Sequence, residues 1–205
     1  MTQSLFEQTG NRKYLVARER LAFVRAARAE GGKIGTFCLA LAFTGARISE
    51  ALALTVDRID VANGSVIFRT LKQRGKVVFR LVPVPIQLLK LLMHDHSISN
   101  ERLWPWGRTT AWKYVKRIMR RAEISEALCK PKALRHAFAI EAGQKGVPLN
   151  IVQRWLGHAR LETTAIYASA MGAEERNLAR RTWQLLEPEI LDQNKSDDRD
   201  IAGLK

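Results

Sequence analysis

Four separated segments of the chain carry side chains that could bind or transfer a phosphate group. They are TGARISEALAL (44–54), LKQRGK (71–76), KALRHAFA (132–139) and LGHARLETTAIY (156–167). A guanidinium can bind a phosphate through two parallel hydrogen bonds, and a phenol can act as a nucleophile once it is activated. Taken singly, His158 could end a helix, Arg135 could be a surface cation and Tyr167 could pack in a core. Only the joint pattern supports a function.

The order and spacing of these segments, over about residues 12–180, resemble the catalytic domain of the tyrosine recombinases, the phage integrase family. In that family an Arg in a TGxRxSE segment, a hairpin Lys, a His-x-x-Arg pair, a Gly-His and a later Tyr form the active site. The resemblance implies these catalytic residues: Arg47, Lys72, Lys132, Arg135, His158 and Tyr167, with Glu50 as the supporting acidic neighbour of Arg47.

Two positions differ from the family pattern or leave a choice open. Lys132 occupies the first position of His-x-x-Arg, and lysine also occurs there in the related type IB topoisomerases. In the hairpin, both Lys72 and Lys76 fit the catalytic lysine. The TGARISE segment begins at residue 44, which leaves no room for the helical core-binding domain of typical members. The resemblance is therefore to short members, such as the fimbrial phase-switch invertases, or to a catalytic-domain fragment.

The chemistry that the resemblance implies suits these side chains. Attack of a tyrosine on a phosphodiester builds negative charge on the non-bridging oxygens, which Arg47 and Arg135 could hold. A phenol with a pKa near 10 is almost wholly protonated at neutral pH, so Lys132 and His158 are candidates to take its proton. Lys72 is the candidate that protonates the departing 5′ oxygen. The bond energy is kept in a 3′-phosphotyrosine, and neither a metal nor another cofactor is expected.

The hydrophobic pattern predicts a mainly α-helical protein with one small antiparallel β-hairpin, which is the α+β fold of the tyrosine recombinase catalytic domain. Segments 65–69 and 77–83 alternate like strands and flank a turn at Gly75. We expect helices at these ranges: 19–30, 35–43, 47–54, 86–94, 109–122 with a Thr109 or Thr110 cap, 132–145, 149–156, 161–168 and 173–186. Arg47 would then stand at a helix start.

Two groups of basic residues are candidates for DNA contact. The hairpin carries Arg69, Lys72, Arg74, Lys76 and Arg80 without an acidic residue, which predicts a cationic finger, although lysines also protect edge strands. The helix after residue 109 carries a basic stripe opposite Trp112, Val115 and Met119, and a solvated face is the alternative reading. The DNA-binding candidates are Arg74, Lys76, Lys113, Lys116, Arg117, Arg120 and Arg121.

Composition supports a polyanionic partner. The chain of 205 residues has 34 Lys and Arg against 20 Asp and Glu, a net charge of +14, which favours nucleic acid over an anionic membrane surface. Cys38 and Cys129 lack metal-ligand spacing, as does the His94 and His96 pair, and no apolar run is long enough for a membrane helix. We expect an extension at 1–11, the catalytic domain at 12–186 and a disordered acidic tail at 187–205.

These expectations give one leading function and two alternatives. The leading function is a cytoplasmic, metal-independent site-specific recombinase that performs integration, excision or inversion as a homotetramer on double-stranded DNA, as the resemblance implies. The first alternative is a type IB-like topoisomerase, which would relax supercoils as a monomer. The second is a non-catalytic DNA-binding regulator with the same fold. The full set of site residues argues against the regulator.

Overall fold

The computed structural model describes residues 5–73, 76–94, 101–158 and 162–165. All of them belong to one unit, Met1–Ala170. The expected helix at 173–186, the tail at 187–205 and Tyr167 lie outside the described residues. None of the helices in the described part combines the length and apolar character that a membrane span requires.

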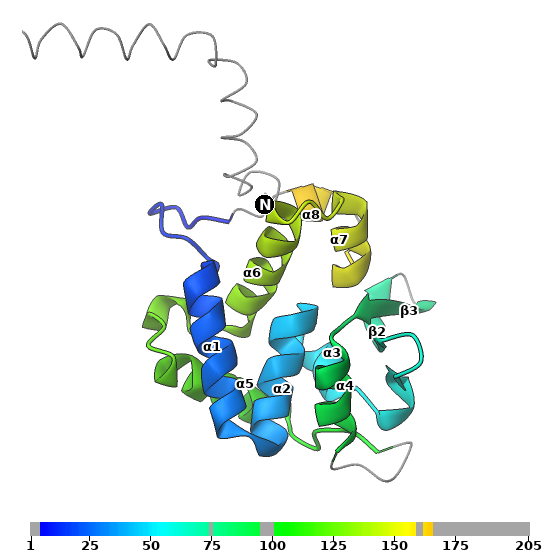
Figure 1. Ribbon diagram of the computed structural model, residues 1–205. Coiled ribbons are helices and arrows are strands. Elements are labelled where there is room, and N and C mark those ends of the chain that lie inside the picture. Colours follow the sequence, from blue (N-terminus) through cyan, green and yellow to red (C-terminus); the bar gives the residue numbers. More distant parts are fainter. Residues whose placement is uncertain (1–4, 74–75, 95–100, 159–161, 166–205) are drawn as a thin grey trace, which may run out of the picture. The chain divides into compact units, whose positions relative to one another are not determined.

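Helices form most of the described structure (Figure 1). Gly31, which has positive φ, separates the first two helices, and Gly32, also with positive φ, begins the second. The α-helices are α1 (Ala17–Glu30), α2 (Gly32–Thr44), α3 (Ile48–Leu52), α4 (Ile86–Met93), α5 (Arg108–Arg121), α6 (Pro131–Gln144), α7 (Leu149–Leu156) and α8 (Glu162–Ala165), with short 3-10 turns at Val56–Arg58 and Glu126–Leu128. The mainly helical architecture expected from the sequence is thus confirmed.

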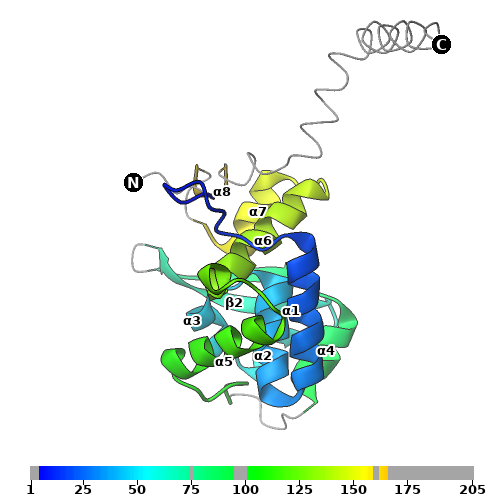
Figure 2. The ribbon, with the colours of Figure 1, turned by 90° about the vertical axis from the view of Figure 1, so that its left-hand side faces the viewer.

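Helix α2 is the centre of the core. It is apolar on almost every side, and α1, α4, α5 and α6 all pack against it. Phe37 of α2 meets the rings of Trp104 and Trp106 edge to face, at centroid distances of 5.0 and 5.8 Å. Figure 2 shows α5 crossing α1 and α2. This packing fixes where the starts of α3, α5 and α6 lie.

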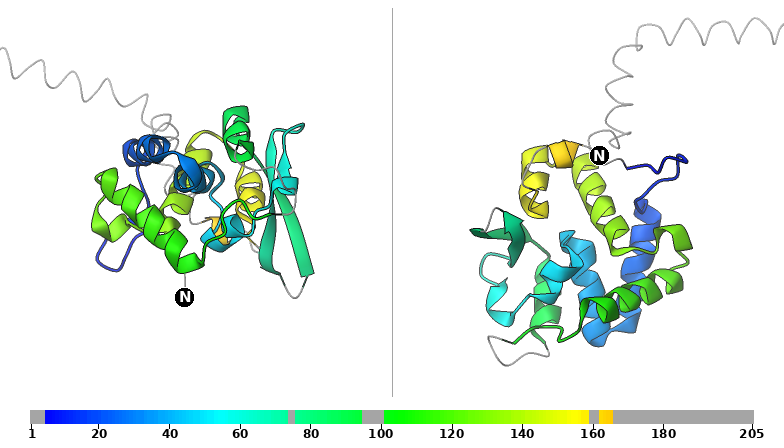
Figure 3. Two further views of the ribbon diagram at one scale, coloured as in Figure 1. Left: turned by 90° about the horizontal axis from the view of Figure 1, so that it is seen from below. Right: turned by 180° about the vertical axis from the view of Figure 1, so that it is seen from behind.

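The sheet has three antiparallel strands in the order β1 (Ile59–Asp60), β2 (Ser65–Gln73) and β3 (Lys76–Pro83). It lies at the edge of the helical body opposite α1 (Figures 1 and 3). Side chains alternate along each strand, so Val66, Phe68 and Thr70 face inward on β2 while Arg80 and Val82 face inward on β3. The expected hairpin is confirmed, and the short strand β1 is an addition to it.

Two local expectations are wrong. Gly107, not Thr109 or Thr110, is the N-cap of α5, so the helix begins two residues earlier than a Thr109 cap would place it and three earlier than a Thr110 cap would. Arg80 does not extend the cationic finger, because the alternation of β3 turns it inward opposite Phe68, where its guanidinium lies 5.1 Å from the ring centroid. Side chains on a strand alternate between its two faces, and this alternation turns Arg80 inward although it is charged. A buried guanidinium must then have hydrogen-bond partners.

Candidate active site

A pocket of about 490 Å³ brings together side chains from three of the four segments that the sequence singled out, 44–54, 132–139 and 156–167, and from α5. It is lined by the start of α3, the start of α5, the start of α6 and the region after α7. Five cations line it, and none of the described residues in its wall is acidic: the cations are Arg47, Arg108, Lys130, Lys132 and Arg135, and the other lining residues include Trp112, His136, His158 and Thr163. Such a wall suits an anion.

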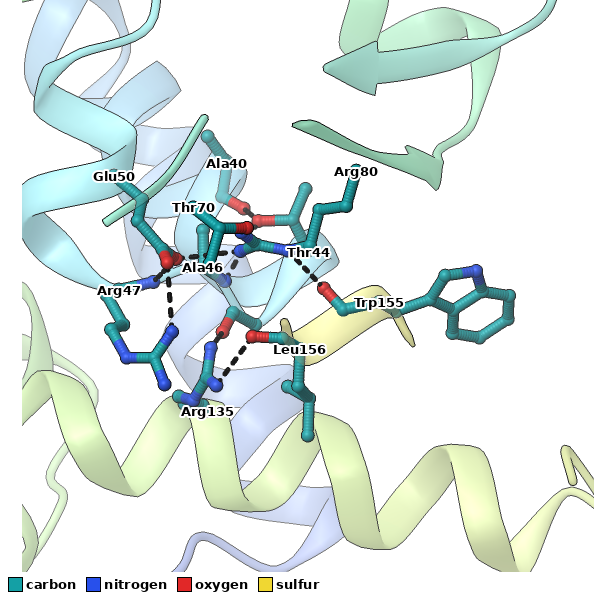
Figure 4. Close-up of polar contacts among 11 residues, drawn as sticks. Ala40, Thr44, Ala46, Arg47, Glu50, Thr70, Arg80, Arg135, Trp155 and Leu156 are labelled. Atoms are coloured by element: carbon teal, nitrogen blue, oxygen red, sulfur yellow. Dashed lines mark hydrogen bonds and ion pairs between the residues drawn. The ribbon is translucent and has the colours of Figure 1, made fainter. Parts of the chain in front are cut away.

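The first arginine is held by a buried carboxylate. Arg47 is the N-cap of α3, as expected, and its backbone N–H donates to Glu50 Oε2 at 2.9 Å. Its Nη1 donates to Glu50 Oε1, also at 2.9 Å, while 42% of the Arg47 side chain stays exposed. Burial would raise the pKa of Glu50, but the charge and hydrogen bond of Arg80 outweigh it and hold the pKa below its ordinary value. Glu50 therefore remains an anion that orients Arg47 toward the pocket (Figure 4).

The second arginine joins two backbone segments. Arg135 lies on α6, is buried, and donates from Nη1 to Gly45 O and from Nη2 to Leu156 O, each at 2.7 Å (Figure 4). Gly45 ends α2 in the left-handed region, with φ +60°, and Leu156 ends α7. A guanidinium carries five N–H donors, so these two bonds fix its plane, and Arg135 also lines the pocket.

His158 is a neutral imidazole in this site. It follows Gly157, which ends α7 with φ +65°, and its Nδ1 lies 2.9 Å from Thr164 Oγ1 on α8. Burial, together with the charges of Arg135 and Arg47, lowers the pKa of His158 to about 3. A ring that resists protonation can accept a proton from a reacting group only when negative charge enters the pocket. A bound phosphate would supply that charge.

The two site histidines predict acid sensitivity of the fold. Burial, with the charges of Lys132 and Arg135, lowers the pKa of His136 to about 4, against 6.5 for an ordinary histidine. Because the unfolded chain binds protons first, their contribution to stability is complete above pH 6.5 and is lost as the pH falls. We expect urea unfolding to show a loss that grows to about 1.4 kcal/mol per pH unit per histidine below about pH 5.5 and ends near the folded-state pKa, about 4 for His136 and about 3 for His158.

Variants separate this effect from acid titration of carboxylates. His158→Gln and His136→Gln should each reduce the slope of unfolding free energy against pH, between pH 6.5 and 5, by the contribution of one histidine. Slopes in both variants equal to that of the wild type would contradict the prediction.

Four of the predicted residues have side chains outside the part of the chain that the structure describes. Lys72 is the penultimate residue of β2 and Lys76 the first of β3, so both lie near the hairpin turn, and their side chains lie outside the described part. Arg74 and the nucleophile candidate Tyr167 also lie outside the described residues. The structure does describe the other candidates for the active site, which are Arg47, Glu50, Lys132, Arg135 and His158. The choice between Lys72 and Lys76 stays a prediction.

The basic stripe of α5 has acidic partners, which the sequence did not place. Glu30 at the end of α1 pairs with Arg117 and Arg121, and Glu126 pairs with Lys116 and Arg120. The stripe is therefore not the uncompensated row of cations that the sequence suggested, because Glu30, which is distant along the chain, and Glu126, which follows the helix, both pair with it. Lys113 is exposed, with no ion pair described for it. DNA contact by these residues stays a prediction.

A charge-reversal variant tests the stripe. Lys116→Glu with Arg120→Glu should weaken binding to any duplex and lower the slope of log affinity against log salt by about one per lost phosphate contact. Fluorescence anisotropy at several salt concentrations measures that slope. The neutral variant Glu126→Gln is the control and should strengthen binding, since it releases the two cations. An unchanged slope would place the DNA surface elsewhere.

Sequence reasoning missed several lining residues. Arg108 and Trp112 are four residues apart and so share one face of α5, and Lys130 is the N-cap of α6. Trp112 was expected in the apolar stripe, yet 39% of it is exposed, and Ala111 and Ile118 are buried instead. The KPKALR run already held the signal for Lys130, since it precedes Lys132 by two residues. No group of three or more metal-ligating side chains occurs in the described part of the chain.

Comparison with known proteins gives the same assignment. The sequence model described as the phage integrase family matches residues 21–173. The tyrosine recombinase XerD of Halalkalibacterium halodurans is 32% identical over 146 residues, which cover 66% of this chain and 48% of that protein. The chain thus spans about half the length of this relative.

Two solved structures show the fold. The crystal structure of XerA recombinase has a TM-score of 0.67 at 22% identity and covers 80% of this chain and 62% of that one. The catalytic domain of bacteriophage HP1 integrase has a TM-score of 0.61 at 22% identity and covers 82% of this chain and 93% of that one. The expected catalytic-domain fold is confirmed, and with the sequence match over most of its length this chain belongs to the phage integrase family of tyrosine recombinases.

Proposed function

We propose that this chain cuts and rejoins double-stranded DNA at specific sites through a 3′-phosphotyrosine intermediate. The observation that carries the proposal is the cationic pocket, in which Arg47, Lys132 and Arg135 converge with His158 from separate segments. The family and the XerD likeness support it. We assign the activity to residues 12–186 in the cytoplasm, with integration, excision or inversion as the outcome.

Each catalytic candidate has a task in this proposal. Arg47 and Arg135 bind the non-bridging oxygens of the scissile phosphate. Their hydrogen bonds to these oxygens become stronger as negative charge develops there. Tyr167 attacks the phosphorus, its oxygen forms the new P–O bond, and the 5′ oxygen leaves. His158 or Lys132 takes the phenol proton, while Lys72 or Lys76 gives a proton to the 5′ oxygen. Religation by a 5′ hydroxyl reverses these steps, so no nucleotide is consumed.

Covalent capture tests the proposal. Duplexes tiled from the DNA that flanks the gene, each with a nick beside the scissile position, should trap a protein–DNA adduct that survives denaturation. Sequencing the trapped DNA gives the site. Tyr167→Phe should abolish the adduct, whereas the matched changes Tyr14→Phe and Tyr114→Phe, at the other two tyrosines of the chain, should leave it. An adduct formed by Tyr167→Phe would contradict the assignment.

The same assays separate the alternatives. Assembly of a tetramer on the DNA, seen by analytical ultracentrifugation with the captured duplex, belongs to the recombinase. Relaxation of supercoiled plasmid by a monomer, without a sequence preference, would favour the type IB-like topoisomerase. Binding without any adduct would favour the regulator.

A further inference from the structure

Arg80 is a buried arginine of β3 that binds three other segments at once. Its Nε donates to Trp155 O at 2.7 Å, its Nη1 to Thr70 Oγ1 at 3.0 Å and its Nη2 to Glu50 Oε2 at 2.7 Å. Only 3% of its side chain is exposed. Each nitrogen of the guanidinium therefore holds a different element, namely α7, β2 and α3 (Figure 4).

Stability alone gives a weak reason for this arrangement. Removing two charges from water is expensive, and a buried ion pair replaced by well-packed apolar side chains often leaves stability unchanged or raises it. The Arg80 and Glu50 side chains are 3% and 0% exposed, so the full desolvation penalty applies to this pair. An apolar pair could not orient its neighbours in this way. The three hydrogen bonds of Arg80 fix the plane of its guanidinium and the position of the Glu50 carboxylate.

Each partner of Arg80 is linked to a residue of the pocket. Glu50 shares its carboxylate between Arg80 and Arg47. Trp155 immediately precedes Leu156, whose carbonyl accepts from Arg135. Thr70 lies two residues before Lys72 on β2. The contacts of one guanidinium thus reach the segments of both pocket arginines and of the hairpin lysine.

Arg80 also packs against the residue that precedes His158. Gly157 has φ +65°, and a Cβ at that position would lie 3.1 Å from Arg80 Nη1 and 3.2 Å from Thr70 Oγ1. The backbone just before His158 therefore packs directly against the guanidinium of Arg80. A shift of Arg80 would move the end of α7 and, with it, the imidazole.

We propose that Arg80 is a positioning residue, which aligns Arg47 through Glu50 and His158 through the end of α7. The inference rests on the function proposed above. Arg80 does not line the pocket and acts only through these neighbours. Its loss should therefore reduce the cleavage step while leaving the DNA-contacting surface in place.

Arg80→Lys is the main test, because lysine keeps a charge beside Glu50 but offers one nitrogen in place of three. We expect the single-turnover cleavage rate at saturating protein to fall about a hundredfold, as misplacement by about 1 Å typically produces. The dissociation constant for the same duplex, measured by anisotropy, should change by less than about threefold, since phosphate contacts at the surface dominate affinity. Arg58→Lys is the matched control, because Arg58 lies beside the same sheet and stacks on Phe79, 5.4 Å from its centroid.

A spectroscopic readout keeps the test independent of catalysis. In ¹⁵N-imidazole NMR spectra at about pH 5.5, the wild-type His158 should be neutral, and His158→Gln identifies its signal. In Arg80→Lys the loosened end of α7 should admit water and let His158 protonate at that pH. If the wild type forms no adduct, the proposed function fails, and this spectrum still decides the role of Arg80.

Folding is checked separately. Arg80→Met with Glu50→Gln removes both charges and avoids a lone buried carboxylate, so it stays folded if Arg80→Lys does not. Its rate should also fall about a hundredfold, with His158 protonated at about pH 5.5. Wild-type rate and a neutral His158 in a folded variant would overturn the proposal. Equal losses of affinity, rate and folded fraction would do the same, because they would show a purely structural residue.

Discussion

Arg135→Lys is expected to slow covalent adduct formation about a thousandfold, the larger loss typical of removing one preorganised donor from a developing oxyanion. A lysine ammonium could reach one of the two carbonyls, of Gly45 or Leu156, but not hold both in one plane. The second carbonyl would stay buried without its donor, which destabilises a protein by about 1–3 kcal/mol. The change should therefore affect both the rate and the fold.

Two measurements on the same samples check this expectation. Single-turnover trapping on the nicked duplex gives the rate, and urea unfolding gives the stability. Arg154→Lys is the matched control, since Arg154 is an exposed arginine of α7, close to Leu156 in sequence. It should change neither quantity. A rate loss in Arg135→Lys that stability alone explains, with the rate restored at low temperature, would remove Arg135 from the proposed chemistry.

The local parts of the site could be predicted from the sequence because they depend on short-range rules. A glycine after an apolar helix predicts a left-handed end, and the residues that follow then start the next helix. This rule placed Arg47 at the start of α3, where Glu50, three residues on, accepts its backbone N–H. The same rule applies at the end of α7, where Gly157 ends the helix in the left-handed region and His158 follows it directly.

The remaining parts depend on contacts between distant segments, which periodicity does not encode. Glu30 and Arg121 pair across 91 positions, so the α5 stripe looked uncompensated in the sequence. Arg80 looked like a member of the basic hairpin, yet the alternation of β3 had the information that it faces inward with Val82. Polarity suggested the opposite orientation. The contact with Glu50, which lies on another segment, is what decides between these two signals.

Gly45→Ala is expected to destabilise the fold by about 3 kcal/mol, because two separate penalties meet at this residue. Its φ of +60° disfavours any residue with a Cβ. A Cβ there would also lie 2.6 Å from Phe138 Cδ1 and 3.1 Å from Leu156 Cδ2, so the turn must move away from α6 and α7. Since Arg135 binds the carbonyl of Gly45, that movement should also disturb the pocket.

Gly64→Ala separates the two penalties. Gly64 has φ +62°, nearly the same as Gly45, but a Cβ there would meet nothing within 4 Å. Urea unfolding should therefore show a loss of only about 1 kcal/mol for Gly64→Ala, from the backbone alone. The difference between the two variants measures the steric overlap with Phe138. If adduct formation by Gly45→Ala matched that of Gly64→Ala, the turn after α2 would not position Arg135, and the pocket arginine would depend on Leu156 alone.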